Sequence, residues 1–154
     1  MIAYHRPKGT DPFLHAESLA SDVRELLKKG VVANHITIMG FSRGAFITSL
    51  TSHYLEETPV NTVLLAGCGR IVSNKYSDIK INGNFLSVYE TTDGASSCRK
   101  LKNRSPKLIS FDEISISTGK EHGAFYRPIS EWVVPVKQWV KEKSSYKSLE
   151  QDKK

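Results

Sequence analysis

The chain has 154 residues, of which 39% are hydrophobic and 25% are charged, so it is long enough for one globular domain and is neither fibrous nor disordered in composition. It contains no apolar run near the roughly 20 residues that a membrane-spanning helix needs, and its start lacks the pattern of a signal peptide. We therefore expect a cytoplasmic protein without membrane contact. The net charge is +6, but the basic residues form no recognisable nucleic-acid-binding motif, so we expect no nucleic-acid partner.

The first two predicted elements are a short strand and an amphipathic helix. The apolar opening at residues 2–5 is consistent with a strand. The helix has a clear start, because Asp11 suits the N-cap and Pro12 suits the first helical position. Apolar residues then recur at helical spacing as far as Leu27, and Gly30 marks the end.

Four further apolar runs predict strands, and they cover residues 35–39, 61–66, 85–90 and part of 108–116. Helices are predicted after the first of these runs and again from near Pro128. Strands that alternate with helices imply parallel crossovers. The pattern predicts an α/β fold with a doubly wound, mainly parallel sheet of about five strands and helices on both faces. We expect residues 1–143 to form this domain and residues 144–154 to form a charged, disordered tail.

The segment Gly40-Phe41-Ser42-Arg43-Gly44 lies between a predicted strand and a predicted helix. A GxSxG string is weak evidence alone, but in this context it has the strand–turn–helix geometry that lifts a serine Oγ clear of a sheet. The serine of such a turn has a strained backbone, and glycines on both sides avoid a Cβ where the chain is crowded. The motif therefore predicts that Ser42 is a nucleophile in an elbow made by Gly40 and Gly44.

A serine hydroxyl needs a base and a group that orients the base. Of the five histidines, His122 lies in a glycine-flanked loop after the last strand, where elbow architectures place their base. Asp93 follows the strand at 85–90, at the carboxyl end where sites of open α/β sheets gather, and Glu90 on the same strand end is the rival acid. The order Ser42, Asp93, His122 is the order in which such architectures carry nucleophile, acid and base.

The sequence has two cysteines, Cys68 and Cys98, without the CxxC spacing of a zinc or redox motif. Each follows the predicted end of a neighbouring strand, which leaves open a disulfide or two unrelated buried thiols. The cytoplasm would keep such a disulfide reduced. No dinucleotide fingerprint or phosphate loop occurs, and we expect no cofactor and no metal.

Taken together, these segments resemble the serine α/β-hydrolase superfamily, in particular its dienelactone-hydrolase-like and esterase-like members. The resemblance covers nearly the whole chain and rests on residues 5–11, 40–44, 64–68 and 119–127. It implies that Ser42 is the nucleophile, His122 the base and Asp93 the acid that orients it. The implied reaction is hydrolysis of a small ester, thioester or amide through an acyl-enzyme.

The chain departs from that superfamily at its front, where members carry about three further strands. One of the missing loops supplies an oxyanion-hole N–H, so the backbone N–H of Arg43 is the only donor predicted here, and loss of one donor costs on the order of a hundredfold to a thousandfold in rate. The alternative hypothesis is a catalytically idle, truncated module that acts as an oligomeric binding protein. A gap beside the elbow strand predicts that residues 2–5 close onto it or that a second chain packs there, and we expect a homo-oligomer.

Overall fold

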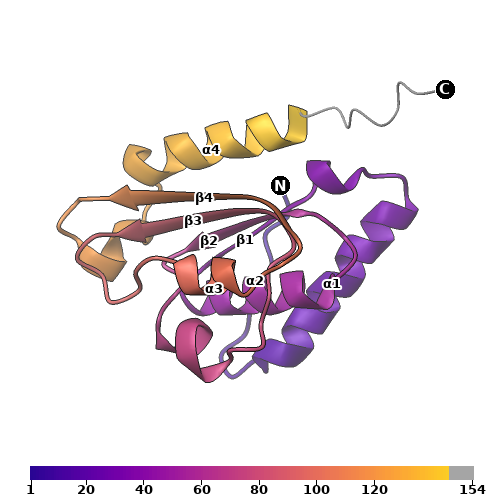
Figure 1. Ribbon diagram of the computed structural model, residues 1–154, viewed down its shortest axis with the longest axis horizontal. Helices are drawn as coiled ribbons and strands as arrows, with labels where there is room; N and C mark the ends of the chain where they lie inside the picture. Colours follow the sequence, from indigo (N-terminus) through magenta and orange to yellow (C-terminus); the bar gives the residue numbers. More distant parts are fainter. Residues whose placement is uncertain (146–154) are drawn as a thin grey trace.

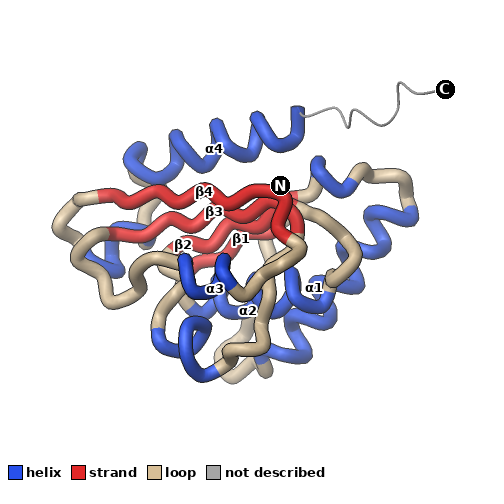
Figure 2. Tube along the Cα trace, viewed as in Figure 1, coloured by secondary structure: helices blue, strands red, loops and turns tan. Residues whose placement is uncertain are grey.

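The structure is a computed structural model that describes residues 1–145, so most of the predicted tail lies outside the described residues. Four strands alternate with helices along the chain (Figure 1, Figure 2). The elements are α1 (Pro12–Lys28), the short helix η1 (Ala33–His35), β1 (Thr37–Phe41), α2 (Arg43–Tyr54), β2 (Asn61–Leu65), the π-helical turn η2 (Ile71–Lys75), β3 (Gly83–Glu90), α3 (Arg99–Asn103), β4 (Leu108–Ile116), the short helix η3 (Glu121–Phe125) and α4 (Ser130–Ser145).

The four strands form one parallel sheet in the order β1-β2-β3-β4. Successive strands are neighbours, and a helical segment lies between each pair of them along the chain. All carboxyl ends therefore lie at one edge of the sheet, at the left in Figure 1. The predicted α/β architecture is confirmed, with helices on both faces.

The prediction of a strand at residues 2–5 is wrong, so the described sheet has four strands instead of about five. Ile2 and Tyr4 are 67% and 51% exposed, and an apolar segment without a core face to bury has nothing to hold it in a ladder. The expected closure of this segment onto the elbow strand is also absent. Within residues 1–145, β1 is an edge strand and pairs on one side alone.

Alternate residues of the central strands face two different cores. Val63 and Leu86 point toward α4, where Val136 and Trp139 are buried against them. The opposite face of β2 and β3 packs against α2, and α1 lies outside α2 (Figure 1). Because both faces of β2 and β3 are covered, their side chains are buried almost throughout, including the polar residues Asn84, Ser87 and Glu90 of β3.

The first helix forms as the sequence predicts. The side chain of Asp11 caps α1 by accepting the N–H groups of Phe13 and Leu14 at 2.8 and 3.0 Å. The chain leaves the helix at Gly30, whose φ of 88° favours glycine. The buried stripe of α1, which includes Ala20 and Val23, packs in a core of its own with α2 and the start of β1.

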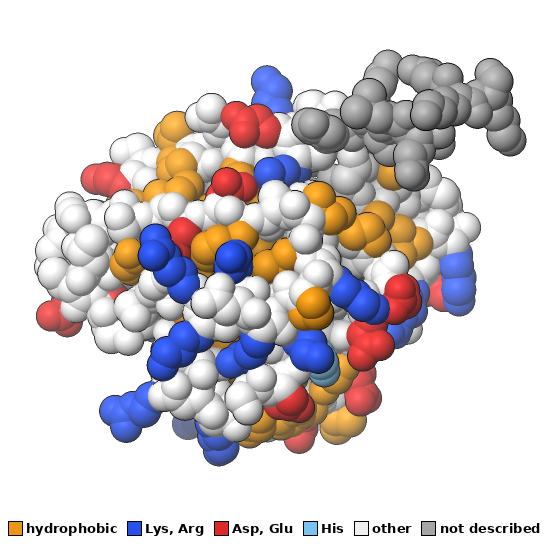
Figure 3. Space-filling model, in the orientation of Figure 1, with side chains coloured by type: hydrophobic (Ala, Val, Ile, Leu, Met, Phe, Trp, Pro, Cys, Tyr) orange, Lys and Arg blue, Asp and Glu red, His pale blue; other side chains and the backbone are white. Residues whose placement is uncertain are grey.

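Charges of both signs are distributed over the surface. On the face drawn in Figure 3, Lys and Arg side chains are most frequent in the lower half, and Asp and Glu side chains are scattered around them. In residues 1–145, no helix combines the length and the apolar character that crossing a membrane requires.

Candidate active site

Ser42 stands at the sharp turn between β1 and α2. Its φ of 53° and ψ of −117° are values that a residue with a Cβ adopts only when its surroundings enforce them. The Ser42 N–H donates to the carbonyl of Leu65 on the neighbouring strand at 3.0 Å, and the Ser42 carbonyl accepts the N–H of Phe46 at 3.1 Å. The turn is therefore tied to the sheet on one side and to α2 on the other.

The two glycines of the elbow contribute differently. A Cβ on Gly40 would lie 2.3 Å from the carbonyl oxygen of Gly44 and 2.5 Å from Oγ1 of Thr48, so glycine lets α2 begin this close to β1. A Cβ on Gly44 would meet nothing within 4 Å. The expectation that both positions exclude a side chain is therefore wrong for Gly44, because its Cβ direction faces open space.

Gly40→Ala is expected to lower the free energy of unfolding by about 2–3 kcal/mol, because the two nearest atoms in the way, O and C of Gly44, belong to the backbone and cannot rotate aside. Urea denaturation at pH 7 measures the change. Gly44→Ala is the matched control and is expected to stay within about 1 kcal/mol of the wild type. Equal destabilisation by the two substitutions would contradict this account of the elbow.

The three side chains predicted as a triad lie in one chain of hydrogen bonds. Nε2 of His122 is 2.8 Å from Oγ of Ser42, and Nδ1 of His122 is 2.7 Å from Oδ2 of Asp93. The side chain of Asp93 is 8% exposed and that of His122 is 36% exposed. Oδ1 of Asp93 accepts the N–H of Ala95 at 3.2 Å, so both carboxylate oxygens are engaged. The imidazole thus connects a buried acid to a partly exposed hydroxyl.

Glu90, the rival acid, is fully buried and has a different set of partners. Its Oε2 accepts the N–H of Thr92 at 2.7 Å and also the Thr92 hydroxyl. Its Oε1 accepts the N–H groups of Thr118 and Gly119 at 2.9 and 3.1 Å. Glu90 therefore joins the loop after β3, which carries the acid, to the loop after β4, which carries the histidine.

Hydrogen bonding lowers the pKa of Glu90 from its ordinary value of 4.5 to about 2. The hydroxyl of Thr92 is the largest cause, and the N–H groups of Thr118, Thr92 and Gly119 add to it against the opposing effect of burial. All of these groups donate to the ionised carboxylate. Glu90 is therefore charged at neutral pH, and its carboxylate binds the loop after β3 and the loop after β4.

An aromatic ring that sequence reasoning missed lies against the imidazole. The ring of Phe41 is 4.8 Å from the ring of His122 between centroids, with an angle of 37° between planes. Phe125 and Tyr126 each lie 5.7 Å from Phe41. The signal was present, since Phe41 directly precedes Ser42 in the motif, but a sequence does not show which ring lies against the end of a strand.

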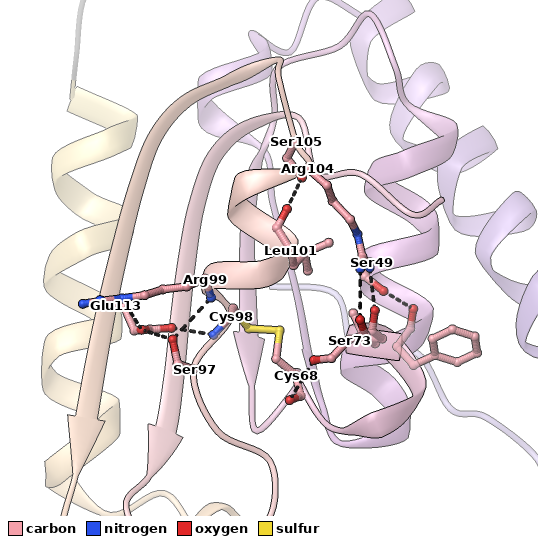
Figure 4. The surroundings of a disulfide bond; sticks show 12 residues. Ser49, Cys68, Ser73, Ser97, Cys98, Arg99, Leu101, Arg104, Ser105 and Glu113 are labelled. Atoms are coloured by element: carbon pink, nitrogen blue, oxygen red, sulfur yellow. Dashed lines mark hydrogen bonds and ion pairs between the residues drawn. A yellow bond between two sulfur atoms is a disulfide. The ribbon is translucent and has the colours of Figure 1, made fainter. Parts of the chain in front are cut away.

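Cys68 and Cys98 form a disulfide, with Cα atoms 5.2 Å apart (Figure 4), so the first of the two alternatives holds. The bond links the loop after β2 to the loop after β3. Next to it, the carboxylate of Glu113 accepts the Ser97 hydroxyl at 2.6 Å and the Cys98 N–H at 2.7 Å. The far end of the acid-bearing loop is therefore fixed by one covalent bond and two hydrogen bonds.

Residues 69–76, here named the pocket wall, follow Cys68 in the loop after β2 and include η2. The guanidinium of Arg104 holds the wall: Nη1 donates to the carbonyl of Ser73 (Figure 4). Its Nε donates to the carbonyl of Ile79 at 2.8 Å, and Nη2 donates to the carbonyls of Val72 and Tyr76. One guanidinium thus satisfies four backbone acceptors of an irregular segment.

A pocket of about 550 Å³ opens between the elbow and the pocket wall. Ser42 and His122 line it, together with residues of α2, of the pocket wall and of the loop after β3. Arg43 begins α2 beside the pocket, and a first-turn N–H has no acceptor within its own helix. In residues 1–145, no group of three or more His, Cys, Asp or Glu side chains is arranged to hold a metal ion, and the expected lack of a cofactor stays a prediction.

Similarity to known proteins agrees with this fold. The chain resembles two solved structures: a variant of SOBER1 from Arabidopsis thaliana, with 14% identity and a TM-score of 0.63, and the virulence factor BioJ from Francisella, with 11% identity and a TM-score of 0.56. The matches cover 90% and 92% of this chain but 67% and 62% of those chains, so this chain spans about two thirds of their length. Identities this low show the fold alone. No curated protein sequence matches.

A family model described as phospholipase/carboxylesterase matches residues 14–121, well over half of the chain. The match includes the elbow, β2, β3 and the acid-bearing loop, and it ends one residue before His122. The chain therefore belongs to the phospholipase/carboxylesterase family, and its fold is that of an α/β-hydrolase.

Proposed function

We propose that the chain is a serine hydrolase of the carboxylesterase type that cleaves an ester, thioester or amide of a small molecule through an acyl-enzyme. The observation that carries the proposal is the hydrogen-bond chain from Ser42 through His122 to Asp93, with its serine end open to a pocket. A hydroxyl alone is a weak nucleophile at neutral pH, and a neutral imidazole within 2.8 Å is the group that activates it.

In this proposal Asp93 fixes the state of the imidazole. Its carboxylate accepts a hydrogen bond from Nδ1–H, which keeps the proton on Nδ1 and leaves the lone pair of Nε2 directed at the hydroxyl of Ser42. The same carboxylate stabilises the imidazolium that forms when Nε2 takes the proton. Because Asp93 is nearly buried, solvent screens this interaction weakly.

The reaction then proceeds in two halves. Oγ of Ser42 bonds to the carbonyl carbon while its proton passes to Nε2 of His122, and the oxyanion receives the N–H of Arg43 at the start of α2. The C–O, C–S or C–N bond breaks as His122 returns the proton to the leaving group. Water, deprotonated by His122, next attacks the acyl-enzyme and releases the carboxylic acid and free Ser42.

The test is reaction of the purified protein with a fluorophosphonate, which forms a bond from Oγ to phosphorus and releases fluoride. We expect one adduct per chain by intact mass. Ser42→Ala is expected to abolish it, and His122→Ala to slow it by on the order of 10²–10⁴-fold. Ser73→Ala removes a hydroxyl of the pocket wall that donates to the Cys68 carbonyl, and this control is expected to label like the wild type.

Stoichiometric labelling of Ser42→Ala, or no labelling of a folded wild-type protein, would overturn the proposal. The second outcome favours the idle binding module.

The homo-oligomer and the cytoplasmic location stay predictions. The unpaired edge of β1, where Met39 is 47% exposed, supports a partner strand. The disulfide argues against the cytoplasm, because such bonds persist mainly in oxidising compartments.

A further inference from the structure

Three cationic side chains line the pocket beside Ser42 and His122: Arg43 from α2, and Arg70 and Lys75 from the pocket wall. No Asp or Glu is among the fourteen lining residues. Asp93 contacts the imidazole at Nδ1, the nitrogen opposite the one that meets Ser42, and is not among the lining residues. The pocket therefore has cationic groups around it and no carboxylate within it.

None of these three cations takes part in an ion pair within residues 1–145. Two lining positions have an acidic neighbour in sequence. Asp11 lies beside Pro12, and its carboxylate is taken up by the N-terminus of α1. Glu121 lies beside His122; it is exposed and is not among the lining residues. Nζ of Lys75 lies 5.4 Å from the ring centre of Tyr76, a contact that keeps the ammonium over the wall without neutralising it.

The rest of the lining is mainly apolar. Phe46, Val72, Ala66 and Ala95 are buried, and Tyr76 is partly exposed. A bound molecule would therefore place a short hydrocarbon part on these residues and meet charge at the exposed rim. Arg70 and Lys75 belong to the wall that the disulfide fixes at one end and Arg104 holds along its length. The backbone that carries these two cations is thus positioned before any ligand arrives.

We propose that the pocket selects esters that carry an anionic group, a carboxylate or a phosphate, at the end of a short hydrocarbon arm. Arg70 and Lys75 are the specificity-determining residues, and Arg43 adds a third positive charge. This inference rests on the proposed function, because it names the substrate class of the same site. Guanidinium and ammonium groups at a pocket without acidic residues favour anions by charge and by hydrogen bonding.

The test uses 4-nitrophenyl esters with one leaving group and different acyl ends: hexanoate, the adipate monoester, 6-phosphonohexanoate and 6-(trimethylammonio)hexanoate. A second pair places the charge on the other arm, with 3-carboxyphenyl and 3-(methoxycarbonyl)phenyl hexanoate. We expect at least one anionic ester to exceed its neutral counterpart about tenfold in kcat/KM at low salt, and the cationic ester to be the poorest. Sodium chloride at 0.5 M is expected to reduce the preference.

The double substitution Arg70→Gln with Lys75→Gln is expected to lower the anionic-to-neutral ratio of kcat/KM about five- to tenfold. Lys137→Gln with Lys141→Gln removes the same charge from the exposed side of α4 and is the matched control, expected to keep the ratio. Arg43 is left in place because its N–H is the proposed oxyanion donor. A ratio near one for every pair, or equal loss in both double variants, would overturn the inference.

Binding to Ser42→Ala separates failure of this inference from failure of the proposed function. Calorimetry with monomethyl adipate and methyl hexanoate needs no turnover, and the anionic ester is expected to bind about tenfold more tightly, with the gain lost in the Arg70→Gln/Lys75→Gln background. Fluorophosphonate labelling without this preference would support the proposed hydrolase function and overturn the inference of an anion-binding site. A preference for the anionic ester without labelling would support the anion-binding site and overturn the proposed hydrolase function.

Discussion

Asp93→Asn is expected to lower kcat by about 10⁴-fold with little change in KM, since a neutral amide neither enforces the Nδ1–H tautomer nor stabilises the imidazolium. In the structure, Oδ2 of Asp93 lies 2.7 Å from Nδ1 of His122 and the Asp93 side chain is 8% exposed, so the contact is direct and largely shielded from solvent. Hydrolysis of 4-nitrophenyl hexanoate measures kcat, and thermal unfolding shows whether the variant is folded. The rate of fluorophosphonate labelling is expected to fall in parallel, because activation of Ser42 is the shared step.

Two variants make this assignment specific. Asp78→Asn neutralises an exposed carboxylate that does not contact His122, and it is expected to retain wild-type kcat. Asp112→Asn removes an acid in β4 whose Oδ2 accepts the indole N–H of Trp139 at 2.7 Å, and its effect is expected on stability. If Asp93→Asn kept more than about a tenth of the wild-type kcat, Asp93 would not be the group that orients His122.

How far the sequence predicted this fold depends on how local each signal is. The bounds of α1 are predictable because Asp11, Pro12 and Gly30 each determine the backbone of their own neighbours. The order of Ser42, Asp93 and His122 is also readable, since each follows a strand with a strong apolar pattern. Residues 2–5 have a strand-like composition, but strands form only with a partner, and nothing in four residues reveals that none is in reach.

The local sequence pattern also does not distinguish the roles of Glu90 and Asp93, because those roles depend on a segment that is distant in sequence. Both carboxylates stand at one strand end, three residues apart, and their roles depend on where the loop after β4 passes. The structure shows that backbone N–H groups at Thr118 and Gly119 converge on one acid while the imidazole meets the other. Arg104 is similar, since its four carbonyl partners lie 25 to 32 residues away along the chain.

Glu90→Gln is expected to lower kcat by on the order of a hundredfold while KM changes little. Four donors face the two carboxylate oxygens, and an amide replaces one acceptor with an NH₂ group that opposes a backbone N–H. The loops that carry Asp93 and His122 then separate slightly, and small errors in their alignment cost rate more than binding. Steady-state kinetics with 4-nitrophenyl hexanoate separates the two parameters.

The pH dependence follows from the pKa of Glu90, which is near 4.5 ordinarily and about 2 in the fold. A group with a lowered pKa stabilises the fold above its ordinary pKa, and this contribution disappears as the pH falls from about 4.5 through about 2. The stability difference between wild type and Glu90→Gln, measured by urea denaturation, is therefore expected to be constant from pH 7 to pH 5 and to shrink below that range.

Glu113→Gln is the matched control, because that carboxylate also accepts hydrogen bonds from a hydroxyl and a backbone N–H, at the far end of the acid-bearing loop, where it lies 4.0 Å from Nε of Arg99. It is expected to destabilise the protein with a smaller loss of kcat than Glu90→Gln. Equal losses of kcat would mean that any weakening of this loop has the same effect. A larger loss in Glu90→Gln would identify Glu90 as a positioning residue, which acts on the reaction through the two loops and not by contact with the substrate.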